Sequence, residues 1–487
     1  MKKFTVSLVL ILVVVAAILA FRASTVFTDR QPEPAQGIGP IEVDAQGAVA
    51  RFAKALTFPT ISNDDRNDFD EAAFIGFREF LREAYPLVHE HAEMTIINDY
   101  SLLFHIPGSD ASLEPVLFMS HMDVVPIEES TRSEWTHPPF AGVVSDSVIW
   151  GRGSLDDKIG VISLMESMEL LLEQNIRPER SVYLAFGHDE EVGGRDGARQ
   201  IANYLAEQNL RFDFVLDEGG AVTEDLLTGI DNDVAVIGVS EKGYVNLRLT
   251  VDAPGGHSSQ PPPQTGLGIL SRAIVKVEDN PFPADITPLL MTFETIGDRM
   301  PWTTRLAMSN LWLLSPLVER SLLSDPGNAA GIRTTTAATM IAGSPKANIL
   351  PTRAEAVVNF RILPGDTVES VKNRVIGLID DPRVSVTDEY GKNPSPVSPI
   401  DTRGYRIIAG TIRGTDGEIL VAPYMVRGGT DATNFYRVSD NVYRFLMVRV
   451  NAATMKYVHG IDEHVAVADY LEAIRFYYHV IRQASQR

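Results

Sequence analysis

The sequence predicts an α/β fold, with a mainly parallel sheet and helices on both of its faces, into which a smaller α+β domain is inserted. Apolar runs alternate with stretches of helical spacing over residues 46–240, as in strands joined by covering helices. Residues 241–390 instead contain strands in which polar and apolar residues alternate, as in a half-exposed sheet. The length of 487 residues also exceeds one ordinary domain.

The larger domain is expected to cover residues 46–240 and to resume at residues 391–487. Short apolar runs predict its strands, and apolar residues three or four positions apart predict its helices. The expected strands are 116–119, 182–186 and 212–216, and the expected helices are 159–172, 198–207 and 465–484. Helices that connect successive strands favour parallel neighbours in the sheet.

The inserted domain is expected over residues 241–390. Alternation predicts strands at 244–251 and 354–362, and helical spacing predicts helices at 267–277 and 368–379. These elements indicate two layers, one of strands and one of helices. Residues 280–340 contain Trp and Pro without a regular period, so we expect this stretch to be irregular.

Residues 1–22 predict a transmembrane anchor or a signal sequence. An uncharged, mostly apolar run covers residues 4–21, between Lys3 and Arg22. Such a run is just long enough to cross a bilayer, and Lys2 and Lys3 favour a cytoplasmic N-terminus. Signal peptides share the pattern, but no small-x-small cleavage site follows, so we expect an uncleaved anchor and an extracytoplasmic catalytic part. Cleavage would make the protein secreted or periplasmic. Residues 23–45, rich in Pro and Gly, are expected to be a linker.

Charge and composition exclude two kinds of chemistry. The net charge of −21 repels the phosphates of nucleic acids, so no nucleic-acid partner is expected. Cysteine is absent from the sequence, which excludes disulfides and thiolate metal sites. Any metal must therefore be held by His, Asp and Glu.

Five short motifs gather carboxylates and imidazoles at or beyond the ends of predicted elements. Each alone has a simpler explanation, such as a hydrogen-bonded histidine, a capped helix or solvated surface acids. Open α/β sheets bind ligands at the carboxyl ends of their strands. The motifs are Ser120–Asp123, Gly151–Lys158, His188–Gly194, Asp217–Gly220 and Val458–Glu463.

Together the motifs predict a metal site, because so many carboxylates at one sheet edge need cations to offset their charge. Two divalent ions would do this, polarise a carbonyl and activate water near neutral pH. With only nitrogen and oxygen ligands, Zn²⁺ is the leading candidate, and Mn²⁺ or Co²⁺ fit the same set.

In their order, the motifs resemble the dinuclear zinc peptidase and acylase family that includes carboxypeptidase S and aminoacylase. The likeness covers residues 45 to the end and is nearest to the branch of carboxypeptidase S and the N-fatty-acyl-amino-acid synthase/hydrolases. It implies a zinc-peptidase catalytic domain with an inserted ferredoxin-like lid and dimerisation domain.

The resemblance implies two zinc ions per subunit. Asp156 in Gly-Arg-Gly-Ser-Leu-Asp would bridge the two ions. The other ligands would be His121, Glu191, Glu218 and His459. Asp217 remains an alternative to Glu218.

Three residues take catalytic roles by the same resemblance. Glu190 would be the general base, and Asp123 would orient His121, as carboxylates behind metal ligands commonly do. His257 in Gly-His-Ser-Ser would reach the active site of a partner subunit and stabilise an oxyanion. Considered alone, His257 is better explained as a turn residue.

The substrate-binding positions implied are Asn348, Arg361, Gly429 and Thr430. A guanidinium such as that of Arg361 can bind both oxygens of a substrate carboxylate. Arg361 also fits a solvated strand position, and Gly429 and Thr430 fit an ordinary turn.

These roles predict a metal-dependent hydrolase of an amide bond next to a free C-terminal amino acid, either a carboxypeptidase or an N-acyl-amino-acid hydrolase. A small peptide or an N-acyl amino acid would be the substrate, and the lid domain would form a homodimer. Two alternatives are a zinc aminopeptidase or dipeptidase, and an inactive membrane-anchored homologue that acts as a binding module. Arg361 argues against the first, and the complete set of ligands with Glu190 argues against the second.

Overall fold

A computed structural model describes residues 2–63, 65, 68–226 and 229–487. Its main sheet has ten strands among these residues, in the order β1-β2-β6-β3-β7-β17-β9-β8-β18, with β16 also beside β9. The central pairs β6–β3, β3–β7 and β7–β17 are parallel, whereas β1–β2 and β2–β6 are antiparallel. The strands are β1 Glu93–Ile97, β2 Ser101–Ile106, β3 Val116–His121, β6 Val182–Gly187, β7 Phe214–Asp217, β8 Val222–Thr223, β9 Val234–Glu241, β16 Leu420–Val426, β17 Val442–Arg444 and β18 Arg449–Val450.

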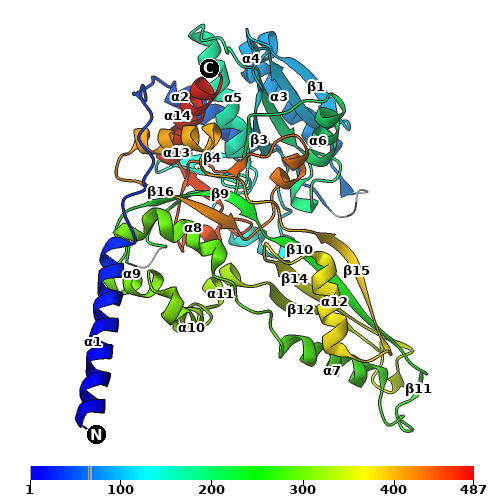
Figure 1. Cartoon of the computed structure of the whole chain (residues 1–487). Helices are drawn as coiled ribbons and strands as arrows, with labels where there is room; N and C mark the ends of the chain where they lie inside the picture. The colour runs from blue at the N-terminus through cyan, green and yellow to red at the C-terminus, as the bar shows by residue number, and fades with distance from the viewer. Residues whose placement is uncertain (1, 64, 66–67, 227–228) are drawn as a thin grey trace.

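Helices cover both faces of this sheet, as predicted (Figure 1). Strand β3 shows why its sequence is apolar throughout. Val116 and Phe118 point into the core shared with α5 and α14, and Leu117 and Met119 into the core beneath α6, because successive side chains of a strand face opposite ways. The helices are α2 Ala45–Ala55, α3 Glu71–Ala84, α4 Pro86–His91, α5 Lys158–Glu173, α6 Ala198–Glu207, α13 Arg403–Thr415 and α14 Val467–Ala484.

A second, antiparallel sheet projects from the main body (Figure 1). In the described chain it has four strands in the order β12-β14-β10-β15, with α7 and α12 on one face. Buried and partly exposed residues alternate along β10, which explains its sequence pattern. This confirms the predicted inserted α+β fold. The elements are β10 Gly243–Asp252, α7 Gly266–Glu278, β12 Thr335–Ala342, β14 Arg353–Ile362, α12 Val368–Ile379 and β15 Val384–Lys392.

Residues 280–340 are not irregular, so that expectation is wrong. Four helices occupy most of the segment before β12 begins: α8 Thr287–Ile296, α9 Trp302–Met308, α10 Leu311–Leu322 and α11 Pro326–Ile332. The pattern was hidden because α10 contains Pro316 and exposes Trp312, Leu313 and Leu317. An amphipathic helix is recognised in a sequence because the residues on its outer face are polar. The residues on the outer face of α10 are apolar, so this signal is missing.

The N-terminal helix α1 (Lys2–Thr25) extends away from the body (Figure 1). Residues 3–25 are long and apolar enough to cross a membrane, and most of their side chains are exposed; Ala23, near the end of the helix, is buried. Between α1 and α2, the described residues form a turn but no helix or strand. It nevertheless lies against the body, where the Gln31 side chain donates to the carbonyl oxygens of Thr295 and Val421 at 3.1 and 3.2 Å.

A small sheet joins the two halves of the larger domain. Its order is β19-β5-β4, from β4 Val143–Ser145, β5 Val148–Trp150 and β19 His464–Ala466. The antiparallel pairing of β19 with β5 places residues near position 460 beside the loop that follows Trp150. Two motifs that lie about 300 residues apart in the sequence are thereby brought together.

An ion pair fastens α2 to α5. Arg51 donates to both carboxylate oxygens of Glu166 at 2.6 and 2.8 Å, and the Tyr85 hydroxyl donates to the same group at 2.9 Å. Glu166 is 7% exposed, so it depends on these donors for charge compensation.

We predict that Arg51→Ala lowers the free energy of unfolding by about 1.5–3 kcal/mol, because the substitution leaves the buried carboxylate short of charge-assisted bonds. Arg132→Ala is the matched control, since Arg132 pairs with Glu129 on the surface and such exposed pairs contribute little to stability. Urea unfolding of the full-length protein measures both. Equal effects of the two substitutions would contradict the prediction.

Candidate metal centre

The predicted site residues meet where the central strands end. His121 is the last residue of β3, and Glu190 and Glu191 begin a 3₁₀ turn after β6. Asp156 precedes α5, and Glu218 follows β7. Because β3, β6 and β7 are adjacent and parallel, their carboxyl ends converge at one edge.

Asp156 is the centre of the cluster. One of its carboxylate oxygens lies 2.9 Å from His121 Nε2, and the other lies 3.0 Å from His459 Nε2. His459 Nε2 is also 3.2 Å from a Glu191 oxygen. Ligand atoms of His121, Asp156 and Glu191 all lie within 4.8 Å of one another. Residues from both ends of the domain thus aim nitrogen and oxygen lone pairs at one place.

Asp123 holds two of the surrounding segments in position. Its carboxylate accepts the backbone N–H groups of Glu190 and Glu191, both at 3.1 Å. The same carboxylate lies 3.4 Å from His121 Nδ1, and the Asp123 carbonyl oxygen lies 3.0 Å from that nitrogen. Asp123 is fully buried, so its orientation is fixed, and it leaves His121 Nε2 facing Asp156.

The imidazoles are held between carboxylates. Contacts with Asp156 and Glu191 raise the pKa of His459 to about 10. Burial opposes a similar rise for His121, but contacts with Asp123 and Asp156 raise its pKa well above the usual value. The Oε1 atom of Glu191 is buried and has no hydrogen-bond partner among the described residues.

These observations fit a metal site. A cation bound by these donors would offset the negative charge of the carboxylates in place of the imidazole protons. Those protons would leave, because metal binding requires neutral imidazole and ionised carboxylate. It would also give the unpaired Glu191 oxygen a partner.

Carboxylates around the cluster are in excess of local cationic groups. Burial, followed by the charges of Asp431, Glu191 and Asp156, raises the pKa of Glu190 well above its usual range. Burial and the charge of Asp156 do the same for Glu218. Like charges at close range disfavour ionisation. Divalent cations at this site would offset the repulsion among the ionised carboxylates.

Glu463 is a site residue to which the sequence interpretation gave no role. Its carboxylate accepts the backbone N–H groups of Leu155 and Asp156 at 2.8 and 3.2 Å and pairs with Arg152 at 2.5 Å. Glu463 and Arg152 are buried. Its place four residues after His459, in the same motif, was the only signal in the sequence.

The loop with Gly429 and Thr430 lies beside the turn of Glu190. Thr430 is buried and its N–H donates to Glu241 at 2.6 Å, while Gly429 is exposed. The next residue, Asp431, packs so closely on Gly194 that a Cβ there would lie 2.1 Å from its carboxylate. Glycine is therefore required at position 194, where φ is +62°.

Arg361 lies near the junction of the two sheets. It is exposed on β14, and its guanidinium stacks over Tyr244 at 4.8 Å. Tyr244 neighbours Tyr390 at 5.9 Å, and Arg195, in the loop after Glu191, lies over Tyr390 at 4.4 Å. A ladder of rings and guanidinium groups thus connects Arg361 with the loop that carries Glu190 and Glu191.

His257 and Asn348 lie elsewhere in this subunit. Both are exposed: His257 belongs to the short strand β11 (Gly256–His257), and Asn348 immediately precedes its partner β13 (Ile349–Leu350). Ser258 N–H donates to the Asn348 carbonyl oxygen at 3.1 Å. Figure 1 shows β11 at the far tip of the projecting domain. The structure therefore places these two residues together, but it does not bring them to Asp156 of the same chain.

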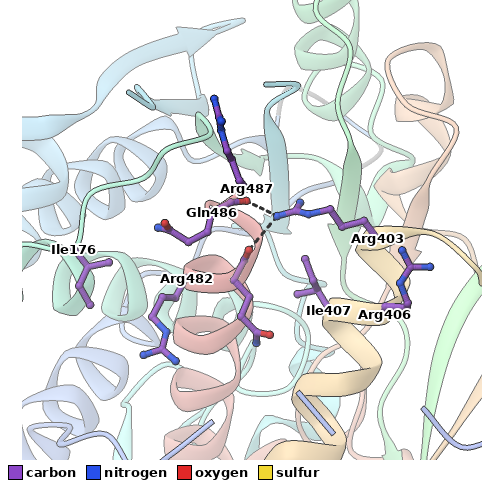
Figure 2. Close-up of a pocket in the computed structure, with 8 residues that line it drawn as sticks. Ile176, Arg403, Arg406, Ile407, Arg482, Gln486 and Arg487 are labelled. Carbon is purple, nitrogen blue, oxygen red and sulfur yellow. Dashed lines mark hydrogen bonds between the residues drawn. The ribbon is translucent and has the colours of Figure 1, made fainter. Parts of the chain in front are cut away.

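A hollow of about 640 Å³ between α13 and α14 is separate from this centre. Figure 2 shows Arg403 directed at the end of α14, where it donates to the carbonyl oxygens of Gln483 and Ala484 at 3.1 and 3.0 Å. The described residues that line the hollow are arginine, glutamine and isoleucine. The hollow therefore offers none of the carboxylate and imidazole groups that surround Asp156.

We predict that Glu463→Gln lowers metal affinity by about 10–100-fold, as expected when a carboxylate behind the ligands is lost. The amide cannot accept two N–H groups and pair with Arg152 as the carboxylate does. Competition with a chelator measures the affinity, and circular dichroism checks the fold. Glu129→Gln, on the surface, is the control, and unchanged affinity in Glu463→Gln would contradict the prediction.

Comparison with known proteins gives one consistent result. Residues 117–483 match the model of "Peptidase family M20/M25/M40". The probable carboxypeptidase S-like 2 of Dictyostelium discoideum is 36% identical over 471 residues, which cover 94% of this chain and 90% of that protein. The human N-fatty-acyl-amino acid synthase/hydrolase PM20D1 is 35% identical over 437 residues, covering 88% and 86%.

Solved structures agree on the fold. An M20 family metallo-carboxypeptidase of Sulfolobus solfataricus, Sso-CP2, superposes with a TM-score of 0.66 at 17% identity, over 90% of this chain and 99% of that one. Human carnosine dipeptidase 1 superposes with a TM-score of 0.60 at 15% identity, over 91% of this chain and 96% of that one.

Proposed function

The chain belongs to peptidase family M20/M25/M40, a family of metal-dependent hydrolases, and we propose that it cleaves the amide bond between an acyl group and an amino acid with a free carboxylate. Its relatives include carboxypeptidase S-like proteins and N-fatty-acyl-amino acid synthase/hydrolases. The observation that carries the proposal is the convergence of His121, Asp156, Glu191 and His459 beside Glu190.

We propose that the cluster holds two divalent cations, with zinc as the leading candidate and manganese or cobalt as alternatives. The two oxygens of Asp156 face different imidazoles, which supports its role as the bridging ligand. His121 would bind on one side, and His459 and Glu191 on the other. Glu218 is proposed as the remaining ligand. When bound, such cations polarise a carbonyl and lower the pKa of water.

Glu190 is proposed as the general base. Its side chain is half-buried next to the ligands, and burial raises its pKa, so it can take up a proton from water and later deliver it to the leaving amine nitrogen. Asp123 would act through position alone, because it fixes the backbone of Glu190 and the ring of His121.

Substrate binding is proposed at the junction of the sheets. The exposed guanidinium of Arg361 would bind the terminal carboxylate in a bidentate manner, and the stack on Tyr244 holds it there. The backbone N–H of the exposed Gly429 would contribute to the same contact, whereas the N–H of Thr430 already donates to Glu241.

A homodimer is proposed through the projecting domain. Strand β12 is an edge strand that exposes Met340 and Ile341, and edge strands readily pair with another chain. In such a dimer the tip with His257 and Asn348 would reach the metal centre of the second subunit, where His257 would stabilise negative charge on the carbonyl oxygen.

We also propose that α1 anchors the protein in a membrane with the hydrolase outside the cytoplasm. The length of α1 and its exposed apolar side chains support this. Alkaline extraction of membranes and N-terminal sequencing would separate an anchor from a cleaved signal.

The activity is tested on metal-reconstituted protein with N-acyl amino acids and dipeptides, each compared with its C-amidated and free-amine counterpart. Hydrolysis that needs the free carboxylate and tolerates a blocked amine is expected. A requirement for a free amine would indicate an aminopeptidase, and no turnover of any substrate would indicate a binding module.

We predict that Glu190→Gln lowers kcat by about 10²–10⁴-fold, which is the usual contribution of a general base, and leaves the metal content unchanged. Glu191→Gln is the informative comparison, because loss of a ligand should lower the metal content itself. Metal analysis and turnover on the same samples measure both. Normal turnover in Glu190→Gln would reject its role as the base.

We predict that Arg361→Leu lowers kcat/KM for carboxylate substrates by about 10–150-fold, which corresponds to about 1.5–3 kcal/mol for a hydrogen bond to a charged group. C-amidated substrates should be affected little, and Arg361→Lys should restore part of the loss. A uniform loss on both substrate classes would mean that Arg361 does not bind the carboxylate.

A further inference from the structure

Helix α10 turns an apolar face outward. Trp312, Leu313, Pro316 and Leu317 are exposed, and their spacing places them on one side of the helix. Trp312 and Leu317 are 62% and 66% exposed, and Trp302 at the start of α9 is 47% exposed. A soluble surface rarely gathers such large apolar side chains unless something covers them.

The end of the apolar helix α1 is bonded to the turn that joins α9 to α10. Arg22 Nε donates to the Ser309 carbonyl oxygen at 3.0 Å, and Asn310 Nδ2 donates to the Leu19 carbonyl oxygen at 3.1 Å. Ser309 and Asn310 are buried. Figure 1 shows α9 and α10 beside the place where α1 meets the body.

The segment that follows α1 is bonded to α8 and to the 3₁₀ turn Gly297–Arg299, which leads into α9. The Phe27 ring packs directly on Gly297, where a Cβ would approach it to 2.5 Å. Asp29 pairs with Arg299 at 3.0 Å, and Arg30 pairs with Glu294 at 3.2 Å. The apolar face of α10 therefore cannot move far from the end of α1.

We propose that this face, made of Trp302, Trp312, Leu313, Pro316 and Leu317, lies in the interface of the bilayer that α1 enters. The connection of this face to the end of α1 indicates that the bilayer covers it. A helix that crosses a bilayer leaves it near the helix end, so residues bonded to that end must lie at the level of the bilayer surface. Tryptophan is enriched at this level of membrane proteins, and an apolar helix face binds there along the membrane plane. The inference rests on the anchor in the proposed function.

The expected lipid is zwitterionic rather than anionic. The chain carries a net charge of −21, and the charged residues of α10 are one acid and one base, Glu319 and Arg320. Binding would therefore come from apolar contact and depend little on salt. It would hold the hydrolase body at the membrane surface, where acyl chains of amphiphilic substrates partition.

The experiment uses the full-length protein in phosphatidylcholine vesicles that contain lipids brominated in the acyl chains, which quench tryptophan at short range. The sequence contains four tryptophans. Trp135 and Trp150 belong to loops and strands near the metal centre, where Trp135 lies over Arg152 and Trp150 packs on His464. Trp302 and Trp312 report on the proposed face.

We predict that brominated lipid quenches a large part of the emission, and that the double variant W302F/W312F loses the quenched component. The matched variant W135F/W150F should keep it, and raising the salt concentration should leave it unchanged. Absence of quenching, or quenching that survives in W302F/W312F, would overturn the inference.

Site-specific labelling gives a second measurement, because the chain has no native cysteine. An environment-sensitive dye on Leu317→Cys should shift to shorter wavelength in vesicles, and the same dye on Asp440→Cys, at a side chain that is 84% exposed, should not. Disulfide cross-linking of two Leu317→Cys chains without a spectral shift would identify a second copy as the partner and reject the bilayer.

Alkaline extraction of the same vesicles reports on α1 separately. Protein that resists extraction but shows no quenching contradicts the inference and leaves the anchor intact. Protein that is extracted contradicts the anchor, and with it the inference. Hydrolytic activity in detergent is measured independently and should be the same in W302F/W312F as in the unmodified chain.

Discussion

The site depends on one carboxylate shared between two imidazoles that lie 338 positions apart in the sequence. Asp156 offers one oxygen to His121 and the other to His459, so the chain must bring both ends of the larger domain to one edge of the sheet. His121 is buried and Asp156 is partly buried, and such groups are costly unless they are paired. Their mutual contact offsets that cost, whereas the His459 side chain is 51% exposed. The pairing of β19 with β5 and the parallel neighbours of β3 both serve this geometry.

Around this cluster, two further carboxylates hold backbone rather than substrate or metal. Asp123 accepts N–H groups from the turn of Glu190 and Glu191, and Glu463 accepts them from Leu155 and Asp156. Buried acceptors of this kind fix where the neighbouring side chains can point, since no water competes for the donors. Glu190, Glu191 and Asp156 therefore lie outside the strands, on backbone that buried carboxylates hold in place.

Contacts between segments that are distant in sequence hold the projecting domain and the N-terminal helix in place. The contacts from Arg361 through Tyr244 and Tyr390 to Arg195 connect the proposed carboxylate anchor with the loop that carries Glu190 and Glu191. On another side, the bonds of Arg22 and Asn310 fix the end of α1 to α9 and α10. Both sets of contacts join elements that are distant in sequence.

Apolar periodicity in the sequence was sufficient to predict the parallel core, the inserted α+β domain and most of their elements, because burial on one or both faces sets the residue pattern. The motifs also identified His121, Asp156, Glu191 and His459 as neighbours, since strand ends converge in this type of fold. Helix α10 was missed because its outer face is apolar, and α9 and α11 are only seven residues long, too short to show a helical period. The role of Glu463, the division of Asp156 between two histidines and the distance of His257 from that centre were decided by tertiary structure alone, because they depend on pairings between segments that no local pattern encodes.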